Sequence, residues 1–235
     1  MEDNLKAAGK GIRQASKRDP AFIALPEYFS VPGSMEKFTS AAEISKITYK
    51  ETTRFLAEIS TEIPNTYLLG GTVVEESQGR FFNTSTLWRN GNLIGKYQKK
   101  NLIKIEVKAG LSSGNKPAVY TTEFCKVGLL VCADMFDSEL ITQTVNLGVE
   151  MIFLPVAALG THPTVKGHPL TERIASENGV FVIKIGNVHS NTRGGRSAVI
   201  APWGILEEVS DAKDDSIITT KVDLSRLREY RRNLQ

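Results

Sequence analysis

Three residues that could carry out chemistry each follow an apolar run of the sequence. Glu27 follows AFIALP, Lys99 follows LIGKYQ, and Cys132 follows VGLLV. Functional side chains are expected at such places, because ligands in open α/β sheets bind beyond the carboxyl ends of the strands. A thiol nucleophile needs a proton acceptor and a group that stabilises the oxyanion formed after its attack. One thiol, one carboxylate and one ammonium at three strand ends would meet those needs.

Each of these residues also has a purely structural interpretation. A lone cysteine beside a strand is more often a small buried hydrophobe, and this is our interpretation of Cys125. Taken alone, Glu27 would be a surface carboxylate and Lys99 a solvated lysine, because charged residues are mostly exposed. The combination of the three residues, rather than any one of them, indicates a catalytic site.

The elements that must position these residues follow from the periodicity of apolar residues. The first half predicts helices at 4–16 and 40–63 and strands at 21–26, 67–76, 81–91 and 93–100. The second half predicts strands at 126–134, 151–158, 180–188, 197–205 and 216–224, with helices at 139–149 and 169–179. Near-continuous Val, Ile and Leu runs are typical of strands covered on both faces. The sequence therefore predicts one α/β domain, 1–235, in which helices cover the sheets.

Composition argues against several classes of protein. The 235 residues include 29 Lys+Arg and 26 Asp+Glu, a formal net charge of +3 that is too even to suggest nucleic acid as a partner. The first twenty residues lack the apolar core of a signal peptide, and no apolar run reaches the length of a membrane span. Two cysteines cannot form a disulfide framework in a chain this long. We therefore expect a cytoplasmic protein with no membrane partner.

The sequence resembles the nitrilase superfamily of carbon-nitrogen hydrolases. Its three motif regions appear in order, as ALPEYF around Glu27, GKYQKKNL around Lys99 and GLLVCAD around Cys132. The similarity continues through LGVEMIFLPVA, ERIASENGVFVIKIGNV and GRSAVIAPWGILEE, so it covers nearly all of the chain. It implies a four-layer αββα sandwich that forms homodimers or larger homo-oligomers. The chain opens inside the family's first helix, so either its start lies upstream or the sheet lacks its first strand.

The resemblance also implies a role for each site residue. Glu27 would be the general base, Lys99 would stabilise the oxyanion, and Cys132 would attack a small amide, or less readily a nitrile, to form a thioester. Glu106 would position substrate or water, and the backbone N–H of Ala133 would complete the oxyanion site.

One loop should line the pocket in this fold. Within residues 157–169, His162 and Lys166 would recognise a substrate carboxylate, and a solvated loop is the alternative. No metal or cofactor is implied. His162, His168 and His189 are spaced unlike a zinc site, and we interpret them as surface or loop histidines.

Two alternatives remain open. Ala133 and Phe136 stand where the family often has an aromatic residue and an arginine, which leaves the local packing and the substrate type open. Asn101 in place of a common histidine is a smaller change. A catalytically degenerate nitrilase-like binding module is the main alternative. A receiver-type domain with Asp134 as acceptor is disfavoured, because an acidic pair near the first strand is missing.

The remaining aromatic and basic residues have structural interpretations. We interpret Trp88 and Trp203 as packing residues. The basic residues near the end of the chain predict a solvated or dimer-contacting helix end, with an interaction arm as the lesser option; they are Arg226, Arg228, Arg231 and Arg232.

Overall fold

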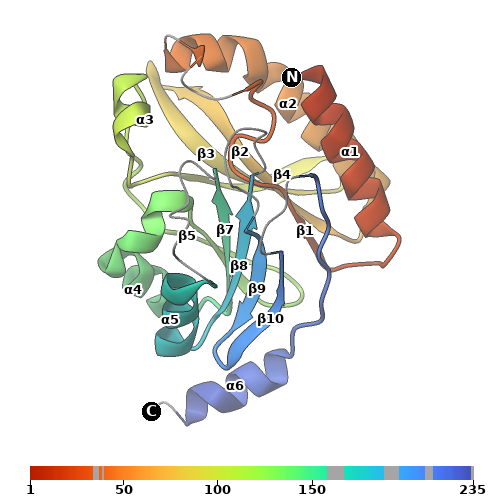
Figure 1. Ribbon diagram of the computed structural model, residues 1–235, viewed down its shortest axis with the longest axis vertical. Helices are drawn as coiled ribbons and strands as arrows, with labels where there is room; N and C mark the ends of the chain where they lie inside the picture. Colours follow the sequence, from red (N-terminus) through yellow and green to blue (C-terminus); the bar gives the residue numbers. More distant parts are fainter. Residues whose placement is uncertain (34–36, 39, 158–166, 188–195, 210–213, 234–235) are drawn as a thin grey trace. The chain divides into compact units, whose positions relative to one another are not determined.

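The computed structural model describes residues 1–33, 37–38, 40–157, 167–187, 196–209 and 214–233. These residues form two compact units, Met1–Lys116 and Pro117–Gln235, and each unit is described by itself. Together the described residues contain ten strands and six α-helices, so the predicted α/β class is confirmed (Figure 1).

The first unit is built on a four-stranded sheet in the order β1-β2-β3-β4. These strands are β1 (Phe22–Ala24), β2 (Tyr67–Ser77), β3 (Arg80–Arg89) and β4 (Asn92–Gln98). β1 pairs in parallel with β2, and the other neighbours are antiparallel. β3 and β4 are joined by Asn90-Gly91, both with positive φ, because a two-residue hairpin turn needs left-handed backbone at both positions. β1 is an edge strand, and helix α1 (Glu2–Ser16) precedes it in the chain.

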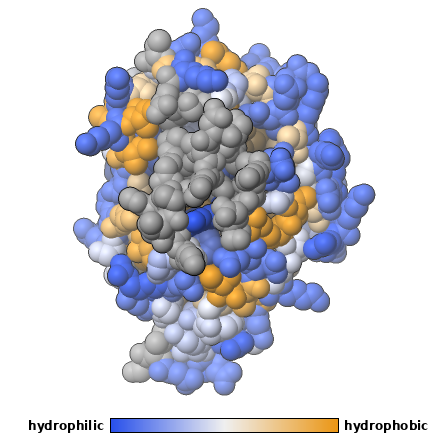
Figure 2. All heavy atoms as spheres, in the orientation of Figure 1, coloured by the Kyte–Doolittle hydropathy of each residue, from blue (hydrophilic) through white to orange (hydrophobic). Residues whose placement is uncertain are grey.

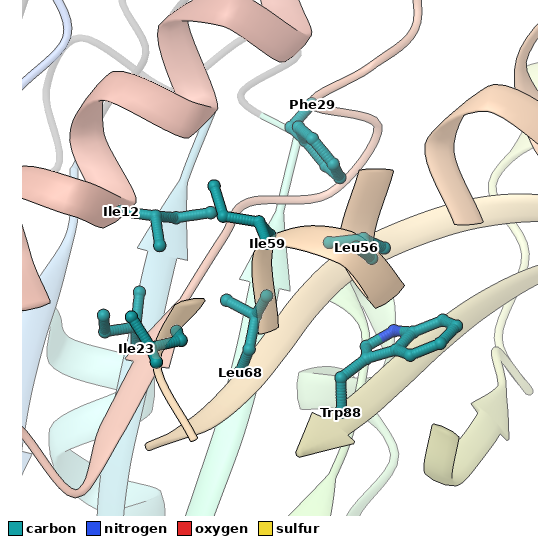
Figure 3. Packing of buried hydrophobic residues seen from close by; sticks show 8 residues of the cluster. Ile12, Ile23, Phe29, Leu56, Ile59, Leu68 and Trp88 are labelled. Carbon is teal, nitrogen blue, oxygen red and sulfur yellow. The ribbon is translucent and has the colours of Figure 1, made fainter. Parts of the chain in front are cut away.

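Two long helices provide the apolar layer that covers this sheet. α1 and α2 (Ala41–Glu62) confirm the predicted helices, and the side chain of Ser40 accepts a hydrogen bond from the backbone N–H of Glu43 to start α2. The core between helices and sheet contains the apolar cluster shown in Figure 3. Its labelled members come from both helices, from three strands and from the segment after β1; they are Ile12, Ile23, Phe29, Leu56, Ile59, Leu68 and Trp88. Trp88 is therefore a packing residue, as predicted.

The second unit is built on a six-stranded sheet in the order β10-β9-β8-β7-β6-β5. These strands are β5 (Ala118–Thr121), β6 (Lys126–Leu129), β7 (Met151–Val156), β8 (Phe181–Gly186), β9 (Ala198–Ala201) and β10 (Gly204–Glu208). The three central strands β6, β7 and β8 are parallel, and the flanking pairs are antiparallel. The crossovers between the parallel strands carry α4 (Ser138–Asn146) and α5 (Pro169–Asn178), which lie next to each other in Figure 1.

The basic helix at the end of the second unit, α6 (Leu224–Arg232), makes contacts that the sequence did not predict. Arg228 forms an ion pair of 2.8 Å with Glu150. The Arg231 guanidinium donates to the backbone carbonyl of Gly179 at 2.6 Å and also to that of Val149. The helix is confirmed, but the interpretation of a solvated end is wrong for Arg231, because its side chain satisfies backbone carbonyls of the same unit.

The structure differs from the sequence prediction at three strands of the second unit. The strand expected at 126–134 ends at Leu129, because a 3₁₀ helix, η2 (Cys132–Phe136), begins soon after it. The strand expected at 197–205 is two strands, β9 and β10, separated by a turn at Pro202-Trp203. Residues 216–223 are described but form no strand. Their β-branched residues favour a pleated surface, yet a strand exists only where a neighbouring backbone pairs with it.

The surface shown in Figure 2 is mainly hydrophilic, with smaller apolar patches between the polar side chains. This agrees with the mixed composition of the chain. Within the described ranges, the structure has no helix with the length and apolar character required to cross a bilayer.

Candidate active site

Glu27 lies just after β1, in a segment that runs beside β2. The N–H of Leu25 donates to the carbonyl of Leu69, and the N–H of Tyr28 donates to the Thr72 hydroxyl at 3.0 Å. Gly71 has a φ of +58°, and a Cβ there would lie 2.1 Å from the Pro26 carbonyl oxygen, so the close approach of the two segments requires glycine. This contact fixes the backbone from which Glu27 extends.

Lys99 follows β4 and is held on both sides by backbone hydrogen bonds. Its N–H donates to the Asn83 carbonyl at 2.8 Å, and its carbonyl accepts from the N–H of Gly114 at 2.8 Å. A Cβ on Gly114 would lie 2.0 Å from the Gln98 carbonyl oxygen, so this approach also needs glycine. The side chain of Lys99 is 0% exposed, and that of Glu27 is 1% exposed. The alternative interpretations of both as surface residues are therefore wrong.

The Lys99 ammonium lies between two buried carboxylates. Its Nζ is 3.0 Å from Oε1 of Glu27 and 2.9 Å from Oε2 of Glu106. Asn83 joins the same two carboxylates, because its Nδ2 donates to Oε1 of both at 2.8 Å. Glu27, Lys99 and Glu106 thus form one connected cluster in the first unit.

Glu106 is fixed in the cluster by donors from three further directions. The Tyr28 hydroxyl donates to Oε1 at 2.7 Å, Asn83 donates to the same oxygen, and the N–H of Ile103 donates to Oε2 at 2.9 Å. The last bond starts the short helix α3 (Lys104–Lys108), in whose first turn Glu106 lies. The carboxylate therefore has little freedom to rotate away from Lys99.

The electrostatics of this cluster are unbalanced when all three groups are ionised. Two carboxylates and one ammonium leave one net negative charge in a site that water hardly reaches. Burying charge without full compensation is costly, and a buried ion pair needs hydrogen bonds to its remaining atoms. The hydrogen bonds from Asn83, from the Tyr28 hydroxyl and from the N–H of Ile103 compensate part of this charge.

Cys132 belongs to the second unit and begins η2, immediately after the apolar segment that follows β6. Its φ is +46°, a left-handed backbone conformation that is uncommon for a residue with a side chain and costs about 1–3 kcal/mol. The turn is closed by Asp134, which is fully buried and whose carboxylate accepts from the N–H of Val131 at 2.9 Å. The side chain of Cys132 is partly exposed. The expected strand-to-helix turn is therefore present, and Asp134 acts within it as a cap.

Cys125 has the properties of a structural cysteine. It is buried, and burial followed by the nearby charge of Glu150 raises the pKa of its thiol to about 11. The thiolate form is therefore scarce at neutral pH. This confirms the interpretation of Cys125 as a buried hydrophobe and separates it from Cys132.

Some residues around the site were missed or misjudged from the sequence. Tyr28 and Asn83 were missed, although an asparagine in the apolar strand FFNTSTLW is a signal that a buried partner is present. His168 lies in the loop before α5, as one of its two interpretations held, but it is not a surface residue: it is 3% exposed, and both of its ring nitrogens meet polar groups of the same unit. Residues 158–166 and 188–195, which contain His162, Lys166 and His189, lie outside the described residues.

The fold and the cluster are accompanied by clear similarity to known proteins. Residues 1–232 match the sequence profile of the carbon-nitrogen hydrolase family. The chain is 32% identical to omega-amidase NIT2-B of Xenopus laevis and 30% identical to omega-amidase NIT2 of Homo sapiens, in both cases over 99% of this chain and 87% of the relative. The crystal structure of Saccharomyces cerevisiae Nit3, a member of branch 10 of the nitrilase superfamily, matches with a TM-score of 0.85 at 27% identity, over 99% of this chain and 88% of that one.

The protein is therefore an α/β enzyme of the nitrilase superfamily, as its sequence motifs predicted. The chain belongs to the carbon-nitrogen hydrolase family, whose members act on carbon–nitrogen bonds other than peptide bonds.

Proposed function

We propose that this chain hydrolyses a small amide through a thioester on Cys132, with Glu27 as general base and Lys99 as oxyanion stabiliser. An ω-amide of a dicarboxylic acid is the favoured substrate, because relatives that match 99% of the chain are named omega-amidases. A nitrile is less favoured, since neither the sequence motifs nor these relatives point to one. His162 and Lys166 remain the proposed contacts for the substrate carboxylate.

In each half of the proposed reaction, Glu27 accepts one proton and returns it. The Cys132 thiol gives its proton to Glu27, and the sulfur attacks the carbonyl carbon. The resulting oxyanion is stabilised by Lys99 and by the N–H of Ala133. The carbon–nitrogen bond then breaks as the nitrogen takes the proton from Glu27, which releases ammonia and leaves a thioester.

Hydrolysis of the thioester reverses these proton transfers. Water, positioned by Glu106, attacks the thioester carbon while Glu27 accepts its proton. The carbon–sulfur bond breaks, the acid leaves, and the sulfur recovers its proton. Each turnover consumes the amide and one water molecule, and all of these side chains return to their starting states.

The observation that carries this proposal is the buried Lys99 ammonium held within 3.0 Å of both Glu27 and Glu106. A purely structural lysine is more often exposed, and replacing buried ion pairs with apolar residues is often neutral or stabilising. Retaining a charged triad of side chains in the core is therefore better explained by chemistry. The left-handed backbone at Cys132 adds independent support, because strained residues cluster at functional sites.

Ammonia release from succinamate, glutaramate and propionamide tests the proposal. We expect release by the unmodified protein, and loss of at least about a thousandfold in Cys132→Ala and Glu27→Gln, since each removes a group that the chemistry cannot replace. Cys125→Ala is the matched control and should keep near-full activity, because Cys125 takes no part in the reaction.

Two results would contradict this proposal. If the unmodified protein and Cys132→Ala release ammonia equally, the degenerate binding module becomes the better account. If Cys125→Ala is as inactive as Cys132→Ala, the assignment of the nucleophile is wrong.

We also propose three broader properties. Both units together form one carbon-nitrogen hydrolase domain, 1–235, which the match over 1–232 supports. The location is cytoplasmic, which two free cysteines support. The chain forms a homodimer or larger homo-oligomer, which size-exclusion chromatography with light scattering would test.

A further inference from the structure

An ionisable side chain in the second unit has no role in the reaction proposed above. Lys184 lies in β8, with β7 on one side and β9 on the other, and it pairs with the buried residues Leu154 and Ala198. A lysine among buried strands is disfavoured by desolvation. Burial and then the charge of Arg196 lower the pKa of Lys184. Its presence in the centre of the sheet calls for a physical reason.

Lys184 is anchored by a chain of two further residues from different elements. Its Nζ is 3.3 Å from Nδ1 of His168, which directly precedes α5. On the other side of the ring, Nε2 of His168 is 3.3 Å from Oε2 of Glu208 in β10. Burial, followed by the charges of Lys184 and Arg196, lowers the pKa of His168 to about 4. The ring is therefore neutral at pH 7, so Nδ1 accepts from the ammonium and Nε2–H donates to Glu208.

The sheet register places Lys184 toward the same end of the parallel strands as Cys132, the carboxyl end. β6, β7 and β8 are parallel, so their carboxyl ends meet at one edge. Lys184 is opposite Leu154, and the N–H of Leu130 donates to the carbonyl of Phe153, so positions 130, 154 and 184 lie on neighbouring strands. Two strand spacings amount to about 10 Å, and Cys132 follows Leu130 by two residues.

The two side chains also interact electrostatically. The negative charge of the Cys132 thiolate raises the pKa of Lys184, opposing the effects of burial and of Arg196. Among the described residues, the charged or titratable groups that act on Lys184 include the cation Arg196, neutral His168 and Cys132, with Glu208 behind the imidazole. A thiol near cations has its thiolate form favoured, as in other reactive cysteines.

We propose that Lys184, anchored through His168 and Glu208, is a positioning residue that stabilises the thiolate of Cys132 before it attacks the substrate. The inference rests on the proposed role of Cys132 as nucleophile. It assigns to Lys184 a task distinct from that of Lys99, which belongs to the cluster of the first unit. The anchor keeps the flexible lysine side chain directed, and the neutral imidazole does so without adding a second positive charge.

The test measures thiolate formation without requiring turnover. The full chain reacts with iodoacetamide between pH 5 and 10, and labelling of Cys132 is quantified by mass spectrometry of its peptide. We expect Lys184→Met to slow labelling at pH 7 about tenfold and to move the midpoint of the pH profile upward, since an opposite charge nearby favours ionisation. Lys184→Arg should stay within about threefold of the unmodified protein.

Two more variants separate electrostatics from folding. Glu208→Gln should slow labelling about threefold by loosening the anchor, and its partly exposed side chain makes this change mild for the fold. Lys221→Met, an exposed lysine of the same unit, is the matched control and should leave the profile unchanged.

Three outcomes would overturn the inference. The first is an unchanged pH profile in Lys184→Met, and the second is equal slowing of labelling in Lys184→Met and Lys184→Arg. The third is an effect of Lys184→Met confined to the KM for an anionic amide in the ammonia-release assay, because Lys184 would then be a substrate contact. Failure of the proposed function is distinguishable, because it would appear as absent ammonia release from the unmodified protein while the labelling profiles still report on Lys184.

Discussion

Replacing Lys99 with methionine should destabilise the first unit strongly. The ammonium lies 3.0 Å from Glu27 and 2.9 Å from Glu106, and all three side chains are almost completely buried. At 3.0 Å, two unit charges attract each other by about 5.5 kcal/mol at an effective dielectric constant of 20. Part of this attraction offsets desolvation, and removing one partner of a buried pair costs about 3–5 kcal/mol. We expect Lys99→Met to lower the free energy of unfolding by this amount, because two buried carboxylates lose their counter-charge.

Urea unfolding followed by tryptophan fluorescence measures this loss. Each unit contains one tryptophan, Trp88 in the first and Trp203 in the second, so a Trp203→Phe background reports on the first unit. Adding Glu106→Gln to Lys99→Met should cost about 1–3 kcal/mol less than the sum of the two single changes, since the groups share one network.

A small effect would contradict the predicted loss. A loss below about 1 kcal/mol is what an exposed ion pair would give. Additive effects of Lys99→Met and Glu106→Gln would likewise show that the two side chains do not interact.

Three other predictions concern backbone packing, pH and thiol reactivity. Gly71→Ala should lower the free energy of unfolding by about 1–3 kcal/mol and reduce amide hydrolysis, because its Cβ would collide with the segment before Glu27. The Cβ of the control, Gly79→Ala, meets no atom within 4 Å, so this variant should lose less stability. Equal urea midpoints for the two variants would contradict this prediction. The fold lowers the pKa of His168 from 6.5 to about 4. As pH falls, the imidazole is therefore protonated in the unfolded chain before it is protonated in the folded protein. The free energy of unfolding should be highest above pH 6.5 and should fall by up to about 3 kcal/mol by pH 4. His168→Gln should flatten that decline in urea titrations, and an unchanged slope would count against the assignment. Iodoacetamide at pH 7.5 should label Cys132 in the folded protein and spare Cys125, because the pKa of the Cys125 thiol is raised to about 11. Equal slow labelling of both cysteines would argue against an activated nucleophile.

The first unit was largely predictable because its elements are determined by local patterns. The amphipathic helix at 40–63, the Asn90-Gly91 turn and the strand-forming runs are all signals within a short window. Glu27 and Lys99 were identified from three motifs in register. Their burial was not predictable, because it depends on Gly71 and Gly114 admitting close backbone contacts between distant segments.

The second unit shows where local patterns fail. Residues 216–223 have the composition of a strand, but pairing requires a neighbouring backbone that composition cannot reveal. His168 has the sequence context of a loop, yet it is buried because Lys184 and Glu208, 16 and 40 positions away, supply partners for its ring. Such partnerships are set by the sheet order and are invisible in any short window.

Mass spectrometry of the reacting enzyme tests the central claim most directly. The protein is mixed with glutaramate, quenched in acid within milliseconds to seconds, digested and analysed for the mass of an acyl group. We predict this group on the Cys132 peptide, rising and falling with turnover, absent from Cys125 and absent in Cys132→Ala. Ammonia release with no acyl group on Cys132 at any time, or continued release by Cys132→Ala, would contradict the account.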